Sequence, residues 1–202
     1  HKQFLVSKKM SKSKLNVFPN FINSKIGFEY NLDSNYIVYA GRISEEKGVN
    51  ELIDTFLKLE QNNFILKIIG DGPILNKLRM KYESSQVNFT GEISNEETLS
   101  IISNSRAVVT ATKLLEGQPT LLCEASIYGI PAIFPNTGGI SEFFPSNYKL
   151  SFKQYDYEDL LSKLKLLIDN NLLKEIGNEN KEYIFSYLNE VDLQDKFKKF
   201  LK

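Results

Sequence analysis

An arginine and a lysine five positions apart form the first group of residues suited to chemistry. Arg42 and Lys47 stand in the segment Gly41-Arg42-Ile43-Ser44-Glu45-Glu46-Lys47-Gly48, directly after an apolar run. A guanidinium offers a planar fork of donors and a lysine offers a mobile point charge, a pair suited to a diphosphate. Gly41 would let the backbone pass close to such a ligand. The alternative is a solvated loop in which both cations pair with Glu45 and Glu46.

The second group contains two glutamates, in the segment Glu116-Gly117-Gln118-Pro119-Thr120-Leu121-Leu122-Cys123-Glu124. Pro119 is suited to the first position of a helix and holds Gln118 extended. The unpaired backbone N–H groups of residues 118–121 and the helix dipole would then form an anion site. Glu116 would lie on the loop above the helix N-terminus, with Glu124 about 7 Å inside the helix.

The expected placement of these two carboxylates bears on the kind of ligand. Glycosidase carboxylates flank one bond at a set spacing, which a loop glutamate and a helix glutamate do not provide. The placement suits a ligand that carries hydroxyl groups on both sides of a diphosphate. An ordinary loop residue and an ordinary helix residue are the alternative interpretation, because two glutamates eight positions apart are common in any chain.

Two glycine-rich segments also follow apolar runs, Gly70-Asp71-Gly72-Pro73 and the segment from Asn136 through Gly138-Gly139 to Glu142. The first predicts a turn with Pro73 as the first helical residue. It lacks the Gly-x-Gly-x-x-Gly spacing of dinucleotide-binding proteins, which counts against a nicotinamide oxidoreductase. Turn formation explains both segments, with ligand contact as a secondary role.

The elements that must position these groups alternate along the chain. Short runs that are apolar on both faces indicate strands of a parallel sheet, and helical periodicity separates them. This alternation predicts an α/β fold, a doubly wound Rossmann-like parallel sheet with helices on both faces. The loops at the carboxyl ends of the strands should then face a ligand crevice. The expected strands are Tyr36–Ala40, Phe64–Ile69, Val87–Phe89, Ala107–Thr110, Ala132–Phe134 and Lys149–Phe152, and the expected helices are Val49–Leu59, Ile74–Glu83, Asn95–Ser103 and Thr120–Tyr128.

The segment after Asp156 has only helical periodicity and predicts a helical C-terminal tail. Leu160, Leu161 and Leu164 begin its first apolar stripe. A last amphipathic segment, Val191 to Leu201, needs an apolar surface to pack against.

The bulk composition excludes several classes of function. Lysine plus arginine and aspartate plus glutamate each number 25, and this balance argues against nucleic acid as a partner. Cys123 is the only cysteine, so an internal disulfide framework and a cysteine-based metal site are excluded. No stretch approaches the roughly 18 apolar residues of a membrane-spanning helix, and no leader pattern is present at the N-terminus. A soluble cytoplasmic protein is expected.

In order and spacing, these segments resemble the C-terminal, donor-binding domain of the family 4 (group 1) retaining glycosyltransferases. The family pattern runs Gly-Arg-x4-Lys-Gly, Gly-x-Gly-Pro, Phe-x-Gly, Glu-x7-Glu and Gly-Gly-x-x-Glu. The resemblance covers nearly the whole chain. Each motif alone is weak evidence for the family, but five motifs in the family's order and spacing are strong evidence. The matching residues are Gly41-Arg42 with Lys47-Gly48, Gly70-Asp71-Gly72-Pro73, Phe89-Thr90-Gly91, Glu116 with Glu124, Gly138-Gly139 with Glu142, and the opening segment Val17-Phe18-Pro19-Asn20-Phe21-Ile22-Asn23, which ends in Asn23 where the family usually has Asp.

The resemblance implies a role for each matching residue. Arg42 and Lys47 would bind the diphosphate of a UDP-, GDP- or ADP-sugar donor and stabilise the leaving nucleotide. Glu116 would hold hydroxyls of the transferred sugar, and Glu124 would accept hydrogen bonds from the ribose. The family needs no metal ion and no other cofactor. Further donor contacts would come from Gly41, Gly72, Ile93 beside the base, and the run Gly117, Gln118, Pro119, Thr120 and Leu121; the family usually has an aromatic or bulky apolar residue where Gln118 stands.

The resemblance also implies one half of a two-domain (GT-B) architecture. Residues 1–14 would be the end of a missing N-terminal domain that supplies the acceptor site, residues 15–190 the donor domain, and residues 191–202 a helix that crosses back. The acceptor would be a glycan or a lipid-linked glycan, in polysaccharide or glycoconjugate synthesis. Peripheral association with the inner membrane face is a further expectation for the full enzyme. Lys8, Lys9, Lys12 and Lys14 could form a membrane-surface patch, but four lysines at a chain end are more often a solvated segment.

Two other interpretations stay open at this point. One is half of a nucleotide-sugar epimerase or glycan phosphorylase with the same architecture, which the Glu-x7-Glu segment with Arg42 and Lys47 disfavours. The other is a non-catalytic nucleotide-binding module. Whether it is half of a transferase or a binding module, this chain alone is expected not to turn over substrate.

Overall fold

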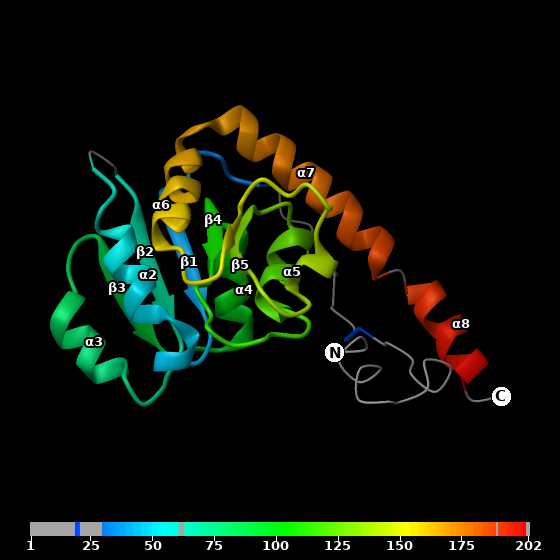
Figure 1. Cartoon of the computed structure of the whole chain (residues 1–202), viewed down its shortest axis with the longest axis horizontal. Helices are drawn as coiled ribbons and strands as arrows, with labels where there is room; N and C mark the ends of the chain where they lie inside the picture. The colour runs from blue at the N-terminus through cyan, green and yellow to red at the C-terminus, as the bar shows by residue number, and fades with distance from the viewer. Residues whose placement is uncertain (1–18, 21–29, 61–62, 189, 201–202) are drawn as a thin grey trace.

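The structure is a computed structural model that describes residues 19–20, 30–60, 63–188 and 190–200. Its centre is a six-stranded sheet in the order β3-β2-β1-β4-β5-β6, with every neighbouring pair parallel (Figure 1). This order confirms the doubly wound Rossmann-like prediction. The expected remnant at residues 1–14 and most of the opening segment lie outside the described residues. The strands are β1 (Tyr36–Ala40), β2 (Ile65–Ile69), β3 (Val87–Gly91), β4 (Ala107–Val109), β5 (Ala132–Asn136) and β6 (Ser151–Lys153).

Helices connect the strands and form the C-terminal tail. The three short 3-10 helices each lie next to a longer element. The α-helices are α2 (Val49–Phe56), α3 (Leu75–Tyr82), α4 (Asn95–Ser103), α5 (Thr120–Ile127), α6 (Tyr157–Lys165), α7 (Asn170–Tyr187) and α8 (Glu190–Phe200), and the 3-10 helices are η2 (Glu45–Lys47), η3 (Ile140–Phe143) and η4 (Leu166–Ile168).

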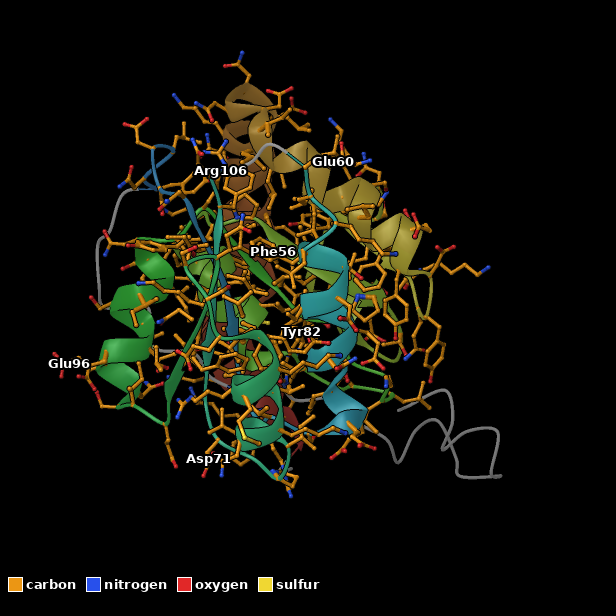
Figure 2. All side chains as sticks on the ribbon, turned by 90° about the vertical axis from the view of Figure 1, so that its left-hand side faces the viewer. Phe56, Glu60, Asp71, Tyr82, Glu96 and Arg106 are labelled. Carbon is orange, nitrogen blue, oxygen red and sulfur yellow. The ribbon has the colours of Figure 1, made fainter. Side chains whose placement is uncertain are left out.

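Both faces of the sheet are buried, which explains why its strands are apolar throughout. In β1, Ile37 and Tyr39 belong to one core cluster and Val38 to the other. The first cluster is covered by α2, α3 and α6, and the second by α4 and α5. In Figure 2, which is turned by 90° from Figure 1, α2 and α4 lie on opposite sides of the strands.

Several predicted boundaries are wrong by one to three residues. The ends of strands are set by hydrogen bonds to the neighbouring strand, and the ends of helices by the hydrogen bonds of their first and last turns. The last strand was expected over Lys149–Phe152, but pairing with β5 fixes β6 at Ser151–Lys153. The first helix ends at Phe56 rather than Leu59, since the amides of Lys58 and Leu59 bond carbonyls three residues back. Pro73 precedes α3 by two positions instead of starting it.

The tail crosses from one face of the sheet to the other. Leu173 and Ile176 of α7 belong to the first core cluster, and Ile184 belongs to the second. Near the crossing Gly177 packs so closely on α5's C-terminal turn that a Cβ would come within 2.1 Å of the Gly129 carbonyl oxygen. Helix α8 then leads away from the sheet (Figure 1). Within the described residues no helix is long and apolar enough to cross a membrane.

The strand order reverses between β1 and β4. From β1 the chain proceeds outward through β2 to β3, then returns to the other side of β1 to form β4. The carboxyl ends of β1 and β4 therefore border the crevice where ligands bind in folds of this kind. Figure 2 marks the two ends of the sheet, with Asp71 at the carboxyl end and Arg106 at the opposite end.

We expect the core under α2 to carry a large share of the stability. The Phe56 side chain is 1% exposed, so Phe56→Ala should lower the free energy of unfolding by about 3–5 kcal/mol through lost burial and an unfilled cavity. Its neighbour Leu57 is 44% exposed, and Leu57→Ala should cost about 1 kcal/mol or less. Urea unfolding of both variants tests this, and equal costs would contradict the described packing.

Candidate functional site

Three loops meet at the carboxyl end of the sheet beside the strand-order reversal. The loop after β4 lies between the loop after β1 and the loop after β5. On one side the Lys113 amide donates to the Glu46 carbonyl oxygen at 2.9 Å. On the other side the Gly139 amide donates to the Glu116 carbonyl oxygen at 2.8 Å. The central loop is thus fixed by backbone bonds to both neighbours.

Glycine makes this close approach of the loops sterically feasible. A Cβ on Gly48 would lie 2.0 Å from the carbonyl oxygen of Ala111, and a Cβ on Gly138 would lie 2.2 Å from that of Glu116. Both glycines also have positive φ angles, +67° and +60°, which other residues adopt only with strain. These glycines of the sequence motifs therefore hold neighbouring loops in contact, a role the sequence had not indicated.

The side chains of Lys47 and Glu116 form an ion pair at this junction. Lys47 Nζ lies 2.6 Å from Glu116 Oε1, and the two side chains are 28% and 26% exposed. Thr112 Oγ1 donates to the same carboxylate oxygen at 3.0 Å. The expected alternative pairing of Lys47 with Glu45 or Glu46 is therefore not the arrangement found. Thr112 was not singled out from the sequence, because a threonine in a loop carries no distinguishing signal.

Arg42 has an exposed side chain at the end of β1. Its backbone is held from the core, since the Tyr39 hydroxyl donates to the Arg42 carbonyl oxygen at 2.8 Å. Burial, with smaller contributions from Glu116 and Glu46, raises the pKa of Tyr39 above its usual range. The phenol therefore stays a neutral donor and fixes the start of the loop that carries Arg42 and Lys47.

The N-terminus of α5 opens onto the same region without a side-chain cap. Helices α2 and α3 also lack a side-chain cap, whereas α4, α6 and α7 are capped by the side chains of Ser94, Asp156 and Asp169. In α5 the N-cap is Pro119, which makes no capping bond, so Pro119 stands one position before the helix rather than at its first residue. Backbone N–H groups at the start of α5 are thus available for an anion, as residues 118–121 were expected to provide.

Glu124 lies on α5, one turn inside the helix, and its carboxyl group is half-buried. No hydrogen bond or ion pair to this carboxylate occurs within the part of the chain that the structure describes. Burial raises the pKa of Glu124 above its ordinary value. A desolvated carboxylate without a partner is costly, and such groups concentrate at functional sites.

Gln118 bonds to the chain segment near the N-terminus. Its side-chain oxygen accepts from the Asn20 amide at 2.5 Å, and its nitrogen donates to the Asn20 carbonyl oxygen at 3.1 Å. This pair of hydrogen bonds to the backbone of one residue gives a structural reason for an amide side chain where the family usually has an aromatic or apolar residue. A contact 98 positions away in the chain has no sequence signal.

Gly72 and Ile93 follow the two strands on the far side of β1. A Cβ on Gly72 would lie 2.1 Å from the Ile43 carbonyl oxygen, so this glycine packs against the loop that carries Arg42. Ile93 is partly buried against the second core cluster, beyond the end of β3. Both residues lie at the same edge of the sheet as the other predicted site residues. Their predicted contacts with a nucleotide stay predictions.

Gln154 and Tyr155 contact the central loop from beyond β6. The Tyr155 hydroxyl donates to the Lys113 carbonyl oxygen at 3.0 Å, and Gln154 Nε2 lies 3.4 and 3.5 Å from the carbonyl oxygens of Thr112 and Leu114. Tyr155 has φ +67°, the one positive φ of a residue other than glycine among those the structure describes. A left-handed backbone costs such a residue about 1–2 kcal/mol.

Comparison with known proteins identifies the family. The sequence model described as "Glycosyl transferases group 1" matches residues 23–183, which is most of the chain and includes every candidate site residue. The chain belongs to the group 1 glycosyl transferases. The matched range contains all five motifs singled out from the sequence.

Members of the family with curated names resemble this chain at modest identity. The putative teichuronic acid biosynthesis glycosyltransferase TuaC of Bacillus subtilis is 30% identical over 122 residues, 60% of this chain and 30% of TuaC. The capsular polysaccharide biosynthesis glycosyltransferase CapM of Staphylococcus aureus is 24% identical over 174 residues, 80% of this chain and 45% of CapM. The matched segments therefore span less than half the length of these two relatives.

Solved structures agree on the fold. A mutant of S. aureus TarM, crystallised with fondaparinux, alpha-GlcNAc-glycerol and UDP, matches with a TM-score of 0.85 at 18% identity, over 98% of this chain and 41% of that one. Anabaena HepE in complex with UDP matches with a TM-score of 0.82 at 14% identity, over 99% of this chain and 60% of that one. At these identities the likeness establishes the Rossmann-like fold alone.

Two glycines with positive φ provide a matched test of the loop contact. Gly91→Ala should cost about 1–2 kcal/mol from left-handed strain alone, because the nearest atom to its Cβ would be an Arg79 nitrogen at 3.9 Å. Gly138→Ala should cost an additional ~1–3 kcal/mol, because the backbone of Glu116 must move. Urea unfolding measures both, and equal costs would refute the loop contact.

The raised pKa of Glu124 predicts how stability varies with pH. The Glu124 carboxyl group binds its proton more tightly in the folded chain than in the unfolded chain. Its charged form therefore lowers the free energy of unfolding at pH values above the pKa of Glu124 in the folded chain. This cost is absent at pH values below the pKa of Glu124 in the unfolded chain. Glu124→Gln should therefore raise the urea midpoint at neutral pH and lose this advantage below about pH 4. The control Glu182→Gln, on the exposed side of α7, should change little at either pH. A lower midpoint for Glu124→Gln at neutral pH would contradict the assignment.

Proposed function

We propose that this chain is the donor-binding half of a glycosyltransferase and binds a nucleotide-diphospho-sugar at the carboxyl ends of β1 and β4. The observation that carries the proposal is the uncapped N-terminus of α5, which along the chain follows Glu116 of the Lys47–Glu116 pair and precedes the half-buried Glu124. An anion bound there would have backbone donors, a helix dipole and cationic side chains around it. Family membership supports the same location, and so does the strand-order reversal, the position at which folds of this kind bind ligands.

Each site residue then has a role that matches its surroundings. The diphosphate would bind the first amides of α5 together with Arg42 and Lys47, which stabilise the charge that develops on the leaving nucleotide. Glu124, inside the helix and without a partner among the residues that the structure describes, would accept hydrogen bonds from the ribose hydroxyls. Glu116, fixed on its loop, would hold hydroxyls of the transferred sugar. The Ile93 loop would contact the base.

The reaction we propose is a retaining glycosyl transfer without a metal ion. The bond between the anomeric carbon and the donor diphosphate breaks, and a bond to an acceptor hydroxyl oxygen forms on the same face of the sugar. The hydroxyl proton leaves with the released nucleoside diphosphate or with solvent. Arg42, Lys47 and the α5 dipole supply the positive charge that a metal provides in other enzymes.

The acceptor would be a growing glycan or a lipid-linked glycan, held by a further domain. TuaC is named as a putative glycosyltransferase of teichuronic acid biosynthesis, and CapM as one of capsular polysaccharide biosynthesis. Both are more than twice as long as the segment matched here, which leaves room for a second domain. We therefore place this chain in cell-surface polysaccharide or glycoconjugate synthesis, inactive in transfer until that domain is present.

Nucleotide binding to the 202-residue chain tests the proposal. We expect one of UDP, GDP or ADP, or a sugar conjugate of it, to shift the amide resonances of residues 117–121 in protein-observed NMR titrations. Arg42→Ala should weaken binding by about tenfold through loss of one charge-assisted contact, and Glu124→Ala by a similar factor. The control Lys77→Ala removes one positive charge from the exposed side of α3 and should leave the affinity unchanged.

Two results would contradict the proposal. One is the absence of binding by the whole nucleotide series at millimolar concentration, both for this chain and for the chain joined to an acceptor domain. The other is binding that Lys77→Ala weakens as much as Arg42→Ala, because the affinity would then reflect net charge rather than this site.

A further inference from the structure

Three consecutive carbonyl groups of the loop after β4 are contacted by two adjacent side chains from outside the site. Tyr155 donates its hydroxyl to the Lys113 oxygen at 3.0 Å, and Gln154 Nε2 lies within 3.5 Å of the oxygens of Thr112 and Leu114. These residues lie 40 to 42 positions apart in the sequence. The family motifs matched above include neither Gln154 nor Tyr155.

The backbone of Tyr155 is held in an unfavourable conformation that solvent-exposed residues normally avoid. Its side chain is 60% exposed, so burial of the ring does not account for the left-handed φ of +67°. The turn is closed on both sides, because the Asp156 amide donates to Lys153 O at 2.9 Å and the Lys153 amide donates to Asp159 Oδ2 at 2.9 Å. Strain of this kind persists where the surrounding structure determines it, and such positions cluster at functional sites.

The contacted segment is the one that determines where the Glu116 carboxylate lies. Thr112 Oγ1 bonds that carboxylate, and Lys113 is anchored on its other side through its amide to Glu46 and its Nζ to Glu51 Oε1 at 2.6 Å. Contacts to the carbonyls of residues 112–114 therefore add a third restraint to a loop that other described residues hold from the β1 and β5 sides.

We propose that Gln154 and Tyr155 are positioning residues for the donor site, holding residues 112–114 so that Glu116 faces the transferred sugar. The inference rests on the proposed function for the identity of the ligand. Its structural part, the restraint of the loop, is independent of any ligand. The two residues touch neither the diphosphate site nor the sugar, and they act through the loop backbone.

Two variants that remove the contacts test the restraint directly. Tyr155→Phe keeps the ring and removes the hydroxyl donor, and Gln154→Ala removes the amide. We expect faster hydrogen exchange at the amides of Lys113 and Gly139, which bond the neighbouring loops, and unchanged exchange in β1 and β2. We also expect affinity for whichever of UDP-, GDP- or ADP-glucose binds the wild type to fall by about three- to tenfold.

A matched control separates positioning from general stability. Tyr30 also donates its hydroxyl to a backbone carbonyl, that of Arg106 at 2.6 Å, but at the opposite end of the sheet (Figure 2 labels Arg106). Tyr30→Phe should lower the urea midpoint and leave both the two amides and the donor affinity unchanged. Tyr155→Asn should instead speed exchange at the Lys113 and Gly139 amides without lowering the urea midpoint. Asparagine tolerates the left-handed backbone, but its side chain cannot reach the Lys113 carbonyl. Its midpoint should equal or exceed that of the wild type while donor affinity falls.

Unchanged exchange at Lys113 and Gly139 in Tyr155→Phe and Gln154→Ala would overturn the inference, whether or not a nucleotide binds. Faster exchange with unchanged donor affinity would also overturn it, because the restraint would then not serve the site. If neither this chain nor the chain joined to an acceptor domain binds a nucleotide-sugar, the proposed function fails, and the exchange data show separately whether the restraint of the loop holds.

Discussion

The contact between the backbone of Glu116 and the glycine pair after β5 is the constraint on which the candidate site depends. Gly138 allows the two loops to approach to a distance that a Cβ would prevent, and Gly139 donates its amide to the Glu116 carbonyl oxygen. The reversal of strand order places these loops side by side, and Gly48 provides a similar contact on the other side. With its backbone fixed, the Glu116 side chain can meet Lys47 and Thr112 at defined distances.

The electrostatics of the free protein leave room for an anionic ligand. Glu116 balances Lys47, while Arg42 is exposed and the first amides of α5 lack a cap. An ion pair that is partly exposed contributes only about 1 kcal/mol or less, so a diphosphate could draw Lys47 away from Glu116 at little cost. Releasing Glu116 in this way would free its carboxylate for sugar hydroxyls. Glu124, which has no hydrogen-bond or ion-pair partner in the described part of the chain, would gain one from the ribose.

The sequence predicts the sheet and the general place of the site because both follow from local patterns. Strands buried on both faces are apolar throughout, as in β1, and the Ser94 cap of α4 lies beside the helix that it begins. Glu116 and Glu124 lie on the loop and on the helix as their spacing indicates. The contacts within the site could not be predicted, because they join distant segments. The Lys47–Glu116 pair and the Gln118–Asn20 bonds depend on strand order, and a tyrosine with positive φ at position 155 has no sequence signature.

A crystal structure of this chain with the nucleoside diphosphate that it binds best would test the central claim most directly. We predict the diphosphate at the N-terminus of α5, within hydrogen-bond distance of the Thr120 and Leu121 amides. The ribose hydroxyls should contact the Glu124 carboxylate, and Lys47 should turn from Glu116 toward a phosphate oxygen. A nucleotide bound elsewhere, such as at the opposite end of the sheet near Arg106, would contradict the proposed donor site.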